Sequence, residues 1–238
     1  MAESKPLDGK LALVTGASRG IGAATAEALA AAGAHVILVA RTPSALEEVE
    51  DRIHQAGGTA TIAPLDLTEG ESIGKLAVAV AERWGKLEVL VLNAAMLGSL
   101  TPVQDIDPKE YSRLLSLNLL ANQALIAAFD PLLKRADKAD VVALTSSVGA
   151  EPRAFWGAYG SSKAALETLL GAYADETEHT GRVRVHIVDP GATRTRMRAL
   201  AFPGEEPDSI KPPEVVADAI VERLIAETST GEKIRVDA

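Results

Sequence analysis

Residues 10–22 read KLALVTGASRGIG, and this stretch decides the fold. The run LALVT is apolar on consecutive positions, which is typical of a strand covered on both faces of a parallel sheet. Three glycines, Gly16, Gly20 and Gly22, follow at once, and the alanine-rich sequence after them predicts a helix over 20–32. The stretch therefore indicates a strand, a glycine turn and a helix in direct succession.

The same alternation continues along the whole chain. Strands are predicted over residues 11–15, 35–40, 59–65, 87–93, 140–146, 182–189 and 233–237. Helices are predicted over residues 20–32, 43–56, 69–84, 107–134, 158–179 and 212–226. Because helix-length segments separate the strands, we expect a single domain over 1–238 with a three-layer, doubly wound α/β fold of the Rossmann type and a seven-stranded parallel sheet. Residues 191–213 interrupt the rhythm with Pro, Gly and charge, and are predicted to form a mobile flap over a site.

The glycine turn is suited to a phosphate group. A strand followed by glycines and a helix places backbone N–H groups and the positive helix end where a phosphate can bind. The spacing G-x-x-x-G-x-G differs from G-x-G-x-x-G and from the phosphate loop G-x-x-x-x-G-K-[ST]. A plain strand-to-helix turn is the alternative interpretation.

The end of the second strand distinguishes between nicotinamide cofactors. In dinucleotide-binding folds an acidic residue there binds the ribose 2′-hydroxyl, whereas arginine accommodates a 2′-phosphate. Here the strand ends with Ala40 and Arg41, and Arg19 in the glycine turn can approach the same place. Two cations without a carboxylate favour NADP(H) over NAD(H). The alternative is that both arginines are only solvated.

A second signal lies in AYGSSKAAL, residues 158–166. Tyr159 and Lys163 are four positions apart on a predicted helix, so they share one face. An ammonium group about 4 Å from a phenol supplies roughly 4 kcal/mol at an effective dielectric constant of about 20. We therefore expect the pKa of Tyr159 to fall toward neutrality, so that this phenol exchanges a proton with an alcohol or carbonyl oxygen.

These motifs together resemble the classical short-chain dehydrogenase/reductase family over essentially the whole chain. The matching segments are Thr15-Gly16-x-x-x-Gly20-Ile21-Gly22, Tyr159-x-x-x-Lys163 and Pro190-Gly191-x-x-x-Thr195. The resemblance implies a catalytic tetrad of Asn118, Ser146, Tyr159 and Lys163. Ser146, after the fifth strand, would polarise the substrate carbonyl, with Ser147 as its rival. Asn118 would help to hold a water linked to Lys163, and a structural amide that joins two helices is the alternative.

The resemblance also implies the contacts of the cofactor. Asp66 resembles the residue beside the adenine, and Asn93 the asparagine after the fourth strand, where Ala95 replaces a usual glycine. The implied cofactor residues are Gly16, Ser18, Arg19, Gly20, Ile21, Gly22, Arg41, Asp66, Leu67, Asn93, Ala94, Tyr159, Lys163, Pro190, Gly191, Thr193 and Thr195. The function implied is reversible hydride transfer between NADP(H) and a carbonyl or alcohol substrate. A non-catalytic dinucleotide-binding regulatory protein is the alternative, although it would not need the tetrad.

Composition excludes several classes of function. The 238 residues carry a net charge of -9, so the field of the molecule repels nucleic acid. There is no cysteine, no apolar signal core and no apolar run long enough for a membrane span, so a cytoplasmic protein is expected. The four histidines lack the spacing of metal ligands, and no metal site is predicted.

Three further features have a functional interpretation. Arg194, Arg196 and Arg198 in the flap suggest the hypothesis of an anionic substrate or acyl-carrier partner. Phe155 and Trp156 stand before Tyr159 and are assigned either to the substrate pocket or to the core. The apolar helices over 107–134 and 158–179 predict a homodimer or homotetramer.

Overall fold

The computed structural model describes residues 5–226 and 228–237. In this part of the chain seven strands form one sheet in the order β3-β2-β1-β4-β5-β6-β7, and every neighbouring pair is parallel. They are β1 (Leu11–Thr15), β2 (His35–Ala40), β3 (Thr59–Pro64), β4 (Val89–Leu92), β5 (Ala139–Leu144), β6 (Val183–Asp189) and β7 (Lys233–Arg235). The chain returns from the edge strand β3 to place β4 beside β1, so the sheet is doubly wound. The predicted seven-stranded parallel sheet is confirmed.

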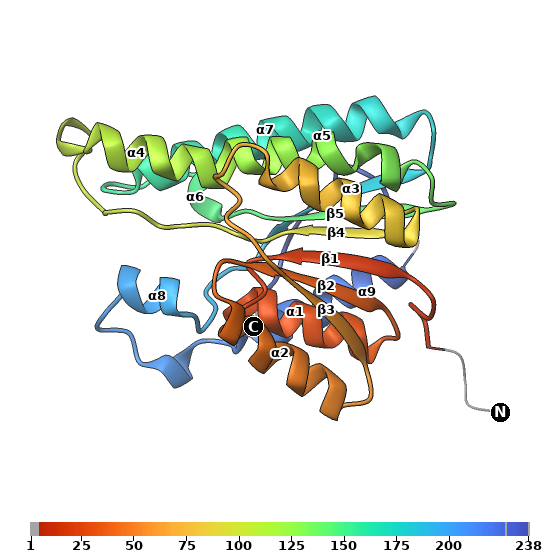
Figure 1. Cartoon of the computed structure of the whole chain (residues 1–238). Coiled ribbons are helices and arrows are strands. Elements are labelled where there is room, and N and C mark those ends of the chain that lie inside the picture. The colour runs from red at the N-terminus through yellow and green to blue at the C-terminus, as the bar shows by residue number, and fades with distance from the viewer. Residues whose placement is uncertain (1–4, 227, 238) are drawn as a thin grey trace.

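Helices cover both faces of the sheet and give three layers (Figure 1). One face carries α1 (Gly20–Ala31), α2 (Pro43–Gln55) and α9 (Pro213–Ile225). The other carries α3 (Ser72–Trp84), α4 (Pro108–Leu115), α5 (Ala121–Leu133) and α7 (Gly157–Glu178). Two short helices, α6 (Ser147–Ala150) and α8 (Arg196–Ala201), follow β5 and β6. None of the helices in the described residues combines the length and the apolar character needed to cross a membrane.

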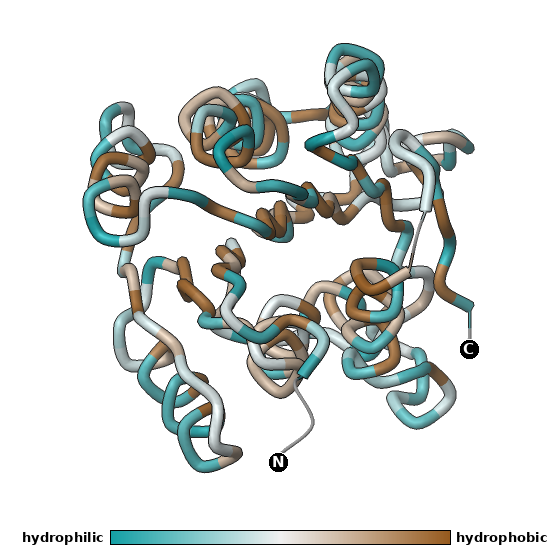
Figure 2. Tube along the Cα trace, turned by 90° about the vertical axis from the view of Figure 1, so that its right-hand side faces the viewer, coloured by the Kyte–Doolittle hydropathy of each residue, from teal (hydrophilic) through white to brown (hydrophobic). Residues whose placement is uncertain are grey.

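The core consists of two apolar layers, one on each face of the sheet. Leu13 packs with Phe129 and Leu170 beneath α5 and α7, whereas its neighbour Val14 packs with Leu46 and the residues of α2 and α9. Successive side chains of a strand point to opposite faces, so both are fully buried. Figure 2 shows the resulting band of hydrophobic residues along the strands, between the two helix layers. The uninterrupted apolar runs of the sequence have this cause.

Two predicted helices differ from the observed ones. The helix predicted from residue 69 begins at Ser72, because residues 66–71 form turns in which the Asp66 side chain accepts hydrogen bonds from Thr68. The helix predicted over 107–134 is divided by a π-helical turn, Ser116–Leu120. Such turns occur frequently at functional sites.

The segment predicted as an irregular flap contains regular structure. It includes α8, whose first turn is capped by Thr195, because the Thr195 hydroxyl accepts a hydrogen bond from the Arg198 N–H. The two ends of the segment are tied together by a β-bridge between Thr193 and Lys211, and Lys211 Nζ donates to the Ala192 carbonyl at 3.0 Å. Residues 191–213 therefore form a loop that is anchored at both ends and contains a short helix, and we call this loop the flap.

Candidate active site

A cavity of about 1320 Å³ lies at the carboxyl ends of β1, β2, β4 and β5, beside the flap. This edge is where open parallel sheets bind their ligands. The predicted site residues that line it are Gly16, Ser18, Arg19, Gly20, Ile21, Arg41, Asp66, Leu67, Asn93, Ala94, Tyr159, Lys163, Pro190 and Thr195. The fold thus brings together residues that are up to 179 positions apart in the sequence, counting from Gly16 to Thr195.

The glycine turn between β1 and α1 leaves no room for side chains. Gly16 has a φ of +65°, and a Cβ there would lie 2.8 Å from Asn93 Nδ2. A Cβ on Gly22 would lie 2.3 Å from the Gly16 carbonyl oxygen. Gly22 does not line the cavity and serves the close packing of α1 against the turn, and its predicted contact with the cofactor stays a prediction.

The turn is held in place by the end of β4. Asn93 Nδ2 donates to the Thr15 carbonyl at 2.8 Å, and the buried Thr15 hydroxyl accepts from the backbone N–H groups of Asn93 and Ala94. These bonds satisfy polar groups that would otherwise be buried without partners. Asn93 therefore fixes the shape of the glycine turn as well as lining the cavity.

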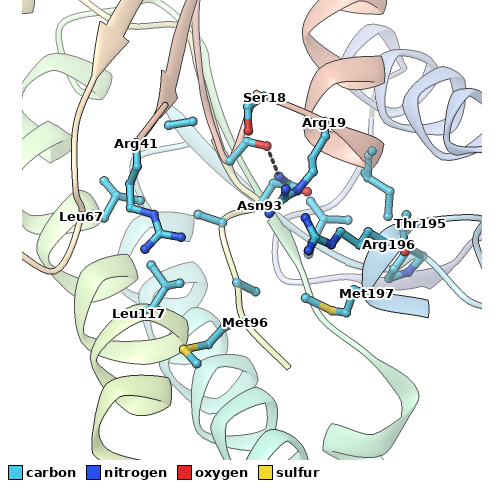
Figure 3. Close-up of a pocket in the computed structure, with 18 of the residues that line it drawn as sticks. Ser18, Arg19, Arg41, Leu67, Asn93, Met96, Leu117, Thr195, Arg196 and Met197 are labelled. Atoms are coloured by element: carbon cyan, nitrogen blue, oxygen red, sulfur yellow. Dashed lines mark hydrogen bonds between the residues drawn. The ribbon is translucent and has the colours of Figure 1, made fainter. Parts of the chain in front are cut away.

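Five arginines line the cavity, and Figure 3 labels three of them, Arg19, Arg41 and Arg196. Figure 3 shows Arg41 on the side of Leu67 and Leu117, and Arg19 and Arg196 reaching toward Asn93 from opposite segments. In the described part of the chain, none of the three forms an ion pair with a carboxylate. The cavity therefore presents cationic groups that an anionic ligand can engage.

Asp66 is the carboxylate predicted to lie beside the adenine. Hydrogen bonds from the hydroxyl and then the N–H of Thr68 lower its pKa, and the charge of Arg41 acts in the same direction. Asp66 is therefore ionised at neutral pH and shapes the turn after β3.

Tyr159 and Lys163 lie on the first two turns of α7 and both face the cavity. Both side chains are buried, and Lys163 Nζ lies 5.7 Å from the centroid of the Tyr159 ring. Lys163 Nζ donates to the Leu144 carbonyl at 2.8 Å, a bond that ties α7 to the end of β5. The one-turn spacing thus places a phenol and an amine on the same wall.

The expectation of a lowered tyrosine pKa is wrong for this structure. Burial, and then the charge of Asp189, raise the pKa of Tyr159 above its ordinary value. Burial also lowers the pKa of Lys163 to about 8, although the charge of Glu167 opposes this. Desolvation disfavours both charged forms, and here it outweighs their mutual attraction. At neutral pH the phenol therefore carries its proton.

Asn118 lies in the π-helical turn and is completely buried. Its Oδ1 accepts from the Met96 N–H, and its Nδ2 donates to the Met96 carbonyl and to Ser162 Oγ, at 2.9 to 3.1 Å. The Asn118 backbone carbonyl accepts from Asn122 Nδ2. These contacts join the loop after β4 to α7 one residue before Lys163, so the structural alternative for Asn118 describes what its side chain does.

Ser146 follows β5 and precedes α6, with an extended backbone. Its neighbour Thr145 lines the cavity, and the Thr145 hydroxyl donates to Glu167, a residue of α7. Ser147 begins α6. Ser146 is half-buried beside the cavity, and its role in catalysis stays a prediction.

Gly191 and Thr193 also lie outside the cavity wall and support it. Gly191 has a φ of +60°, and a Cβ there would lie 2.8 Å from the Val236 carbonyl oxygen. The buried Thr193 hydroxyl donates to the Pro190 carbonyl at 2.9 Å. Both residues shape the exit from β6, and their predicted contacts with the cofactor stay a prediction.

The flap arginines divide into two kinds. Arg194 pairs with Asp208 at 2.7 Å, and Arg198 makes two hydrogen bonds to Glu205, at 2.6 and 2.7 Å. Both carboxylates belong to the flap itself. Arg196, which forms no ion pair among the described residues, extends toward Arg19 (Figure 3), and both Arg194 and Arg196 line the cavity. The hypothesis of an anionic substrate or acyl-carrier partner stays a prediction.

Comparison with known proteins identifies the family. The family described as short chain dehydrogenase matches residues 10–206. The chain belongs to the short-chain dehydrogenase family. It is 38% identical over 210 residues to the uncharacterized oxidoreductase YciK of Escherichia coli K12, covering 87% of this chain and 82% of that protein.

Solved structures of short-chain dehydrogenases have the same fold. A short chain dehydrogenase from Salmonella enterica serovar Typhi superposes with a TM-score of 0.94 at 33% identity, covering 100% of both chains. A structure from Escherichia coli CFT073 complexed with NADPH has a TM-score of 0.90 at 35% identity, covering 99% of this chain and 100% of that one. The Rossmann-type fold is therefore confirmed.

Several residues of this short-chain dehydrogenase were not anticipated in the site. Thr42, Arg113, Leu117 and Met197 all line the cavity. Arg113 and Leu117 belong to the segment 107–134, which reads in the sequence as one leucine-rich helix. Only the structure shows which residues of this segment face the cavity. Met197 lies on the short helix α8, which has too few residues to produce a periodic signal.

Proposed function

We propose that this short-chain dehydrogenase transfers a hydride reversibly between NADP(H) and a carbonyl or alcohol substrate, with Tyr159 as the acid and base. One observation carries the proposal. The phenol of Tyr159 and the amine of Lys163 line the same cavity as the glycine turn. Reduction of a carbonyl group needs a bound dinucleotide and a proton donor. The cavity offers a turn suited to the phosphate groups of the dinucleotide and a phenol that can donate the proton.

The residues of the cavity fit a phosphorylated dinucleotide. Gly16 lines the cavity and has no room for a side chain in the turn after β1, so the backbone itself can approach a ligand there. Arg19 and Arg41 supply cations suited to a 2′-phosphate, and no acidic side chain stands at the end of β2. The NADPH complex of a similar structure supports the same choice. When bound, the nicotinamide supplies or accepts the hydride.

The protein's own part in the reaction is the movement of a proton. Tyr159 holds its proton at neutral pH, because burial raises its pKa, and donates it to the carbonyl oxygen during reduction. The phenolate left behind is stabilised by the Lys163 ammonium on the same wall. Ser146 polarises the carbonyl by a hydrogen bond, and Asn118 positions α7 through Ser162. In the alcohol direction the phenolate accepts the proton.

A coupled assay tests this proposal. NADPH oxidation is followed with a panel of aldehydes and ketones, for the native protein and for Tyr159→Phe. We expect the variant to lose nearly all turnover while its Kd for NADPH changes less than about threefold, because only the proton donor is removed. A variant with native turnover contradicts the mechanism.

The same assay addresses the non-catalytic regulator. The known relatives of this chain are oxidoreductases, which does not favour that alternative. If NADPH binds tightly and no carbonyl compound is reduced, the regulator replaces the enzyme as the best interpretation.

A further inference from the structure

The surroundings of Tyr159 are apolar. Its side chain forms a buried cluster with Leu97 and Val148. Four partly buried apolar residues pack against this cluster, namely Leu100, Trp156, Met197 and Ala201. Together with the cluster, these residues come from the loop after β4, from α6, from the start of α7 and from the flap helix α8. We call all seven residues, the three of the cluster and the four packed against it, the apolar wall.

Aromatic contacts attach the flap to the apolar wall. The Trp156 ring meets the Tyr159 ring edge to face, with centroids 6.0 Å apart, and lies 5.8 Å from the ring of Phe202 at the end of α8. The Arg198 guanidinium stacks 3.7 Å above Phe202 and is neutralised by Glu205. Trp156 therefore packs against the proton donor without lining the cavity itself, whereas Phe155 is exposed and belongs to neither pocket nor core.

The cationic groups near the apolar wall have partners of their own or point elsewhere. Arg194 and Arg198 are paired with carboxylates of the flap, and Arg196 extends toward Asn93 (Figure 3). Met197, next to Arg196, belongs both to the cavity lining and to the apolar wall. Adjacent residues of α8 thus serve two regions, a cationic one at the glycine turn and an apolar one at Tyr159.

We propose that the substrate is a neutral carbonyl compound with an aryl or alkyl substituent held against Met197, where the apolar wall meets the cavity, and that analogues with a carboxylate on this substituent are excluded. The inference rests on the proposed function and names its substrate class. A carboxylate placed against Met197 loses its hydration, which is costly, and Arg194 and Arg198 of the flap are already paired with carboxylates. An aryl or alkyl group gains burial instead.

The reaction is balanced for this class. The carbonyl carbon accepts a hydride from the reduced nicotinamide, and the carbonyl oxygen accepts the Tyr159 proton. One C=O becomes CH–OH, and the dinucleotide is oxidised by two electrons. The phenolate regains a proton from solvent before the next turnover.

A pair of ketones of similar shape measures the exclusion. Methyl 4-acetylbenzoate is neutral, and 4-acetylbenzoate carries one negative charge at the same position. We expect kcat/KM with NADPH to favour the ester by roughly 100-fold, because only the anion must be desolvated against the wall. Equal values, or a preference for the carboxylate, overturn the inference while leaving the proposed function intact. If neither these ketones nor any other carbonyl compound is reduced, the proposed function fails and the inference falls with it.

Two glutamine variants on α8 test the place of the wall. Met197→Gln keeps the length of the side chain and makes it polar, whereas Leu200→Gln makes the same kind of change at a site that is 67% exposed on the same helix. We expect Met197→Gln to lower kcat/KM for the ester by roughly tenfold and to narrow the ratio between ester and carboxylate. Leu200→Gln leaves both values unchanged, and the Kd for NADPH stays native in both variants.

The variants have a clear adverse outcome. Equal effects of Met197→Gln and Leu200→Gln on the ester overturn the proposed location of the substituent. If Met197→Gln does not fold, Trp156→Leu is measured in its place, with the same expectation of a reduced preference for the ester. The ratio measured on the native enzyme tests the substrate class independently of every variant.

Discussion

Raising the pH through about 8 removes the charge of Lys163 and slows carbonyl reduction. Burial lowers the pKa of Lys163 to about 8, so about nine-tenths of this side chain is charged at pH 7 and about one-tenth at pH 9. The pKa of Tyr159 is raised instead, so the phenol keeps its proton over the same interval. The rate of carbonyl reduction is therefore expected to fall as the pH rises, because high pH removes the ammonium charge of Lys163 but not the proton of Tyr159.

The size of the effect comes from the geometry of the pair. Lys163 Nζ lies 5.7 Å from the Tyr159 ring centroid. At an effective dielectric constant of about 20, a unit charge at this distance stabilises the phenolate by about 3 kcal/mol. This corresponds to about a hundredfold in rate. We therefore expect kcat/KM for reduction to fall above pH 8 toward a value about a hundredfold lower.

The assay is the pH profile of kcat/KM from pH 6 to 10, which reports groups of the free enzyme. Glu167 raises the pKa of Lys163, so Glu167→Gln moves the inflection to lower pH. Glu178→Gln, at the end of the same helix, serves as the matched control and leaves the profile in place. A profile that stays flat to pH 10 while far-UV circular dichroism shows a folded protein refutes the reasoning. An inflection that Glu167→Gln does not move refutes its assignment to Lys163.

Four further outcomes are expected. Arg41→Asp should raise the Kd of NADPH by about 10-fold to 100-fold and leave the Kd of NADH within about threefold. The reason is that a hydrogen bond to a charged group contributes about 1.5–3 kcal/mol. Unchanged cofactor selectivity in fluorescence titrations contradicts this prediction. Arg196→Gln should weaken NADPH and NADH equally, since Arg196 reaches toward the glycine turn, whereas Arg198→Gln should weaken neither. Asp140→Asn removes the buried negative charge shared by two basic side chains of β6 and replaces one acceptor oxygen by a donor. It should therefore cost about 3 kcal/mol and lower Tm by about 6–12 °C in calorimetry; a shift below about 2 °C speaks against it. Light scattering should give the mass of a dimer or tetramer formed through α4, α5 and α7, and a monomeric mass ends that prediction.

Most of the fold was predictable because its signals are local. A strand buried on both faces must be apolar at every position, and the run LALVT of β1 meets that condition. The boundaries of the helices were less predictable, since they depend on turns that compete with the first turn of a helix. Ser72 begins α3 late because Asp66 forms its own turn with Thr68, and that competition leaves no mark in the apolar periodicity.

The π-helical turn shows a second limit. Residues 107–134 read as one continuous helix, and nothing in their composition sets Asn118 apart. The turn is stabilised by bonds from Asn118 to Met96 and Ser162, which are 22 and 44 positions away in the sequence. Such contacts exist only after the sheet has assembled.

The sequence by itself determined the order of strands and helices, the glycine turn after β1 and the shared face of Tyr159 and Lys163, because each of these depends on residues a few positions apart. Only the tertiary structure decided that Tyr159 has a raised pKa, that Arg194 and Arg196 line the cavity whereas Arg198 does not, and that the proton donor packs against apolar side chains. The physical reason is that desolvation and ion pairing depend on what surrounds a group, and those surroundings are assembled from segments that are distant in the chain.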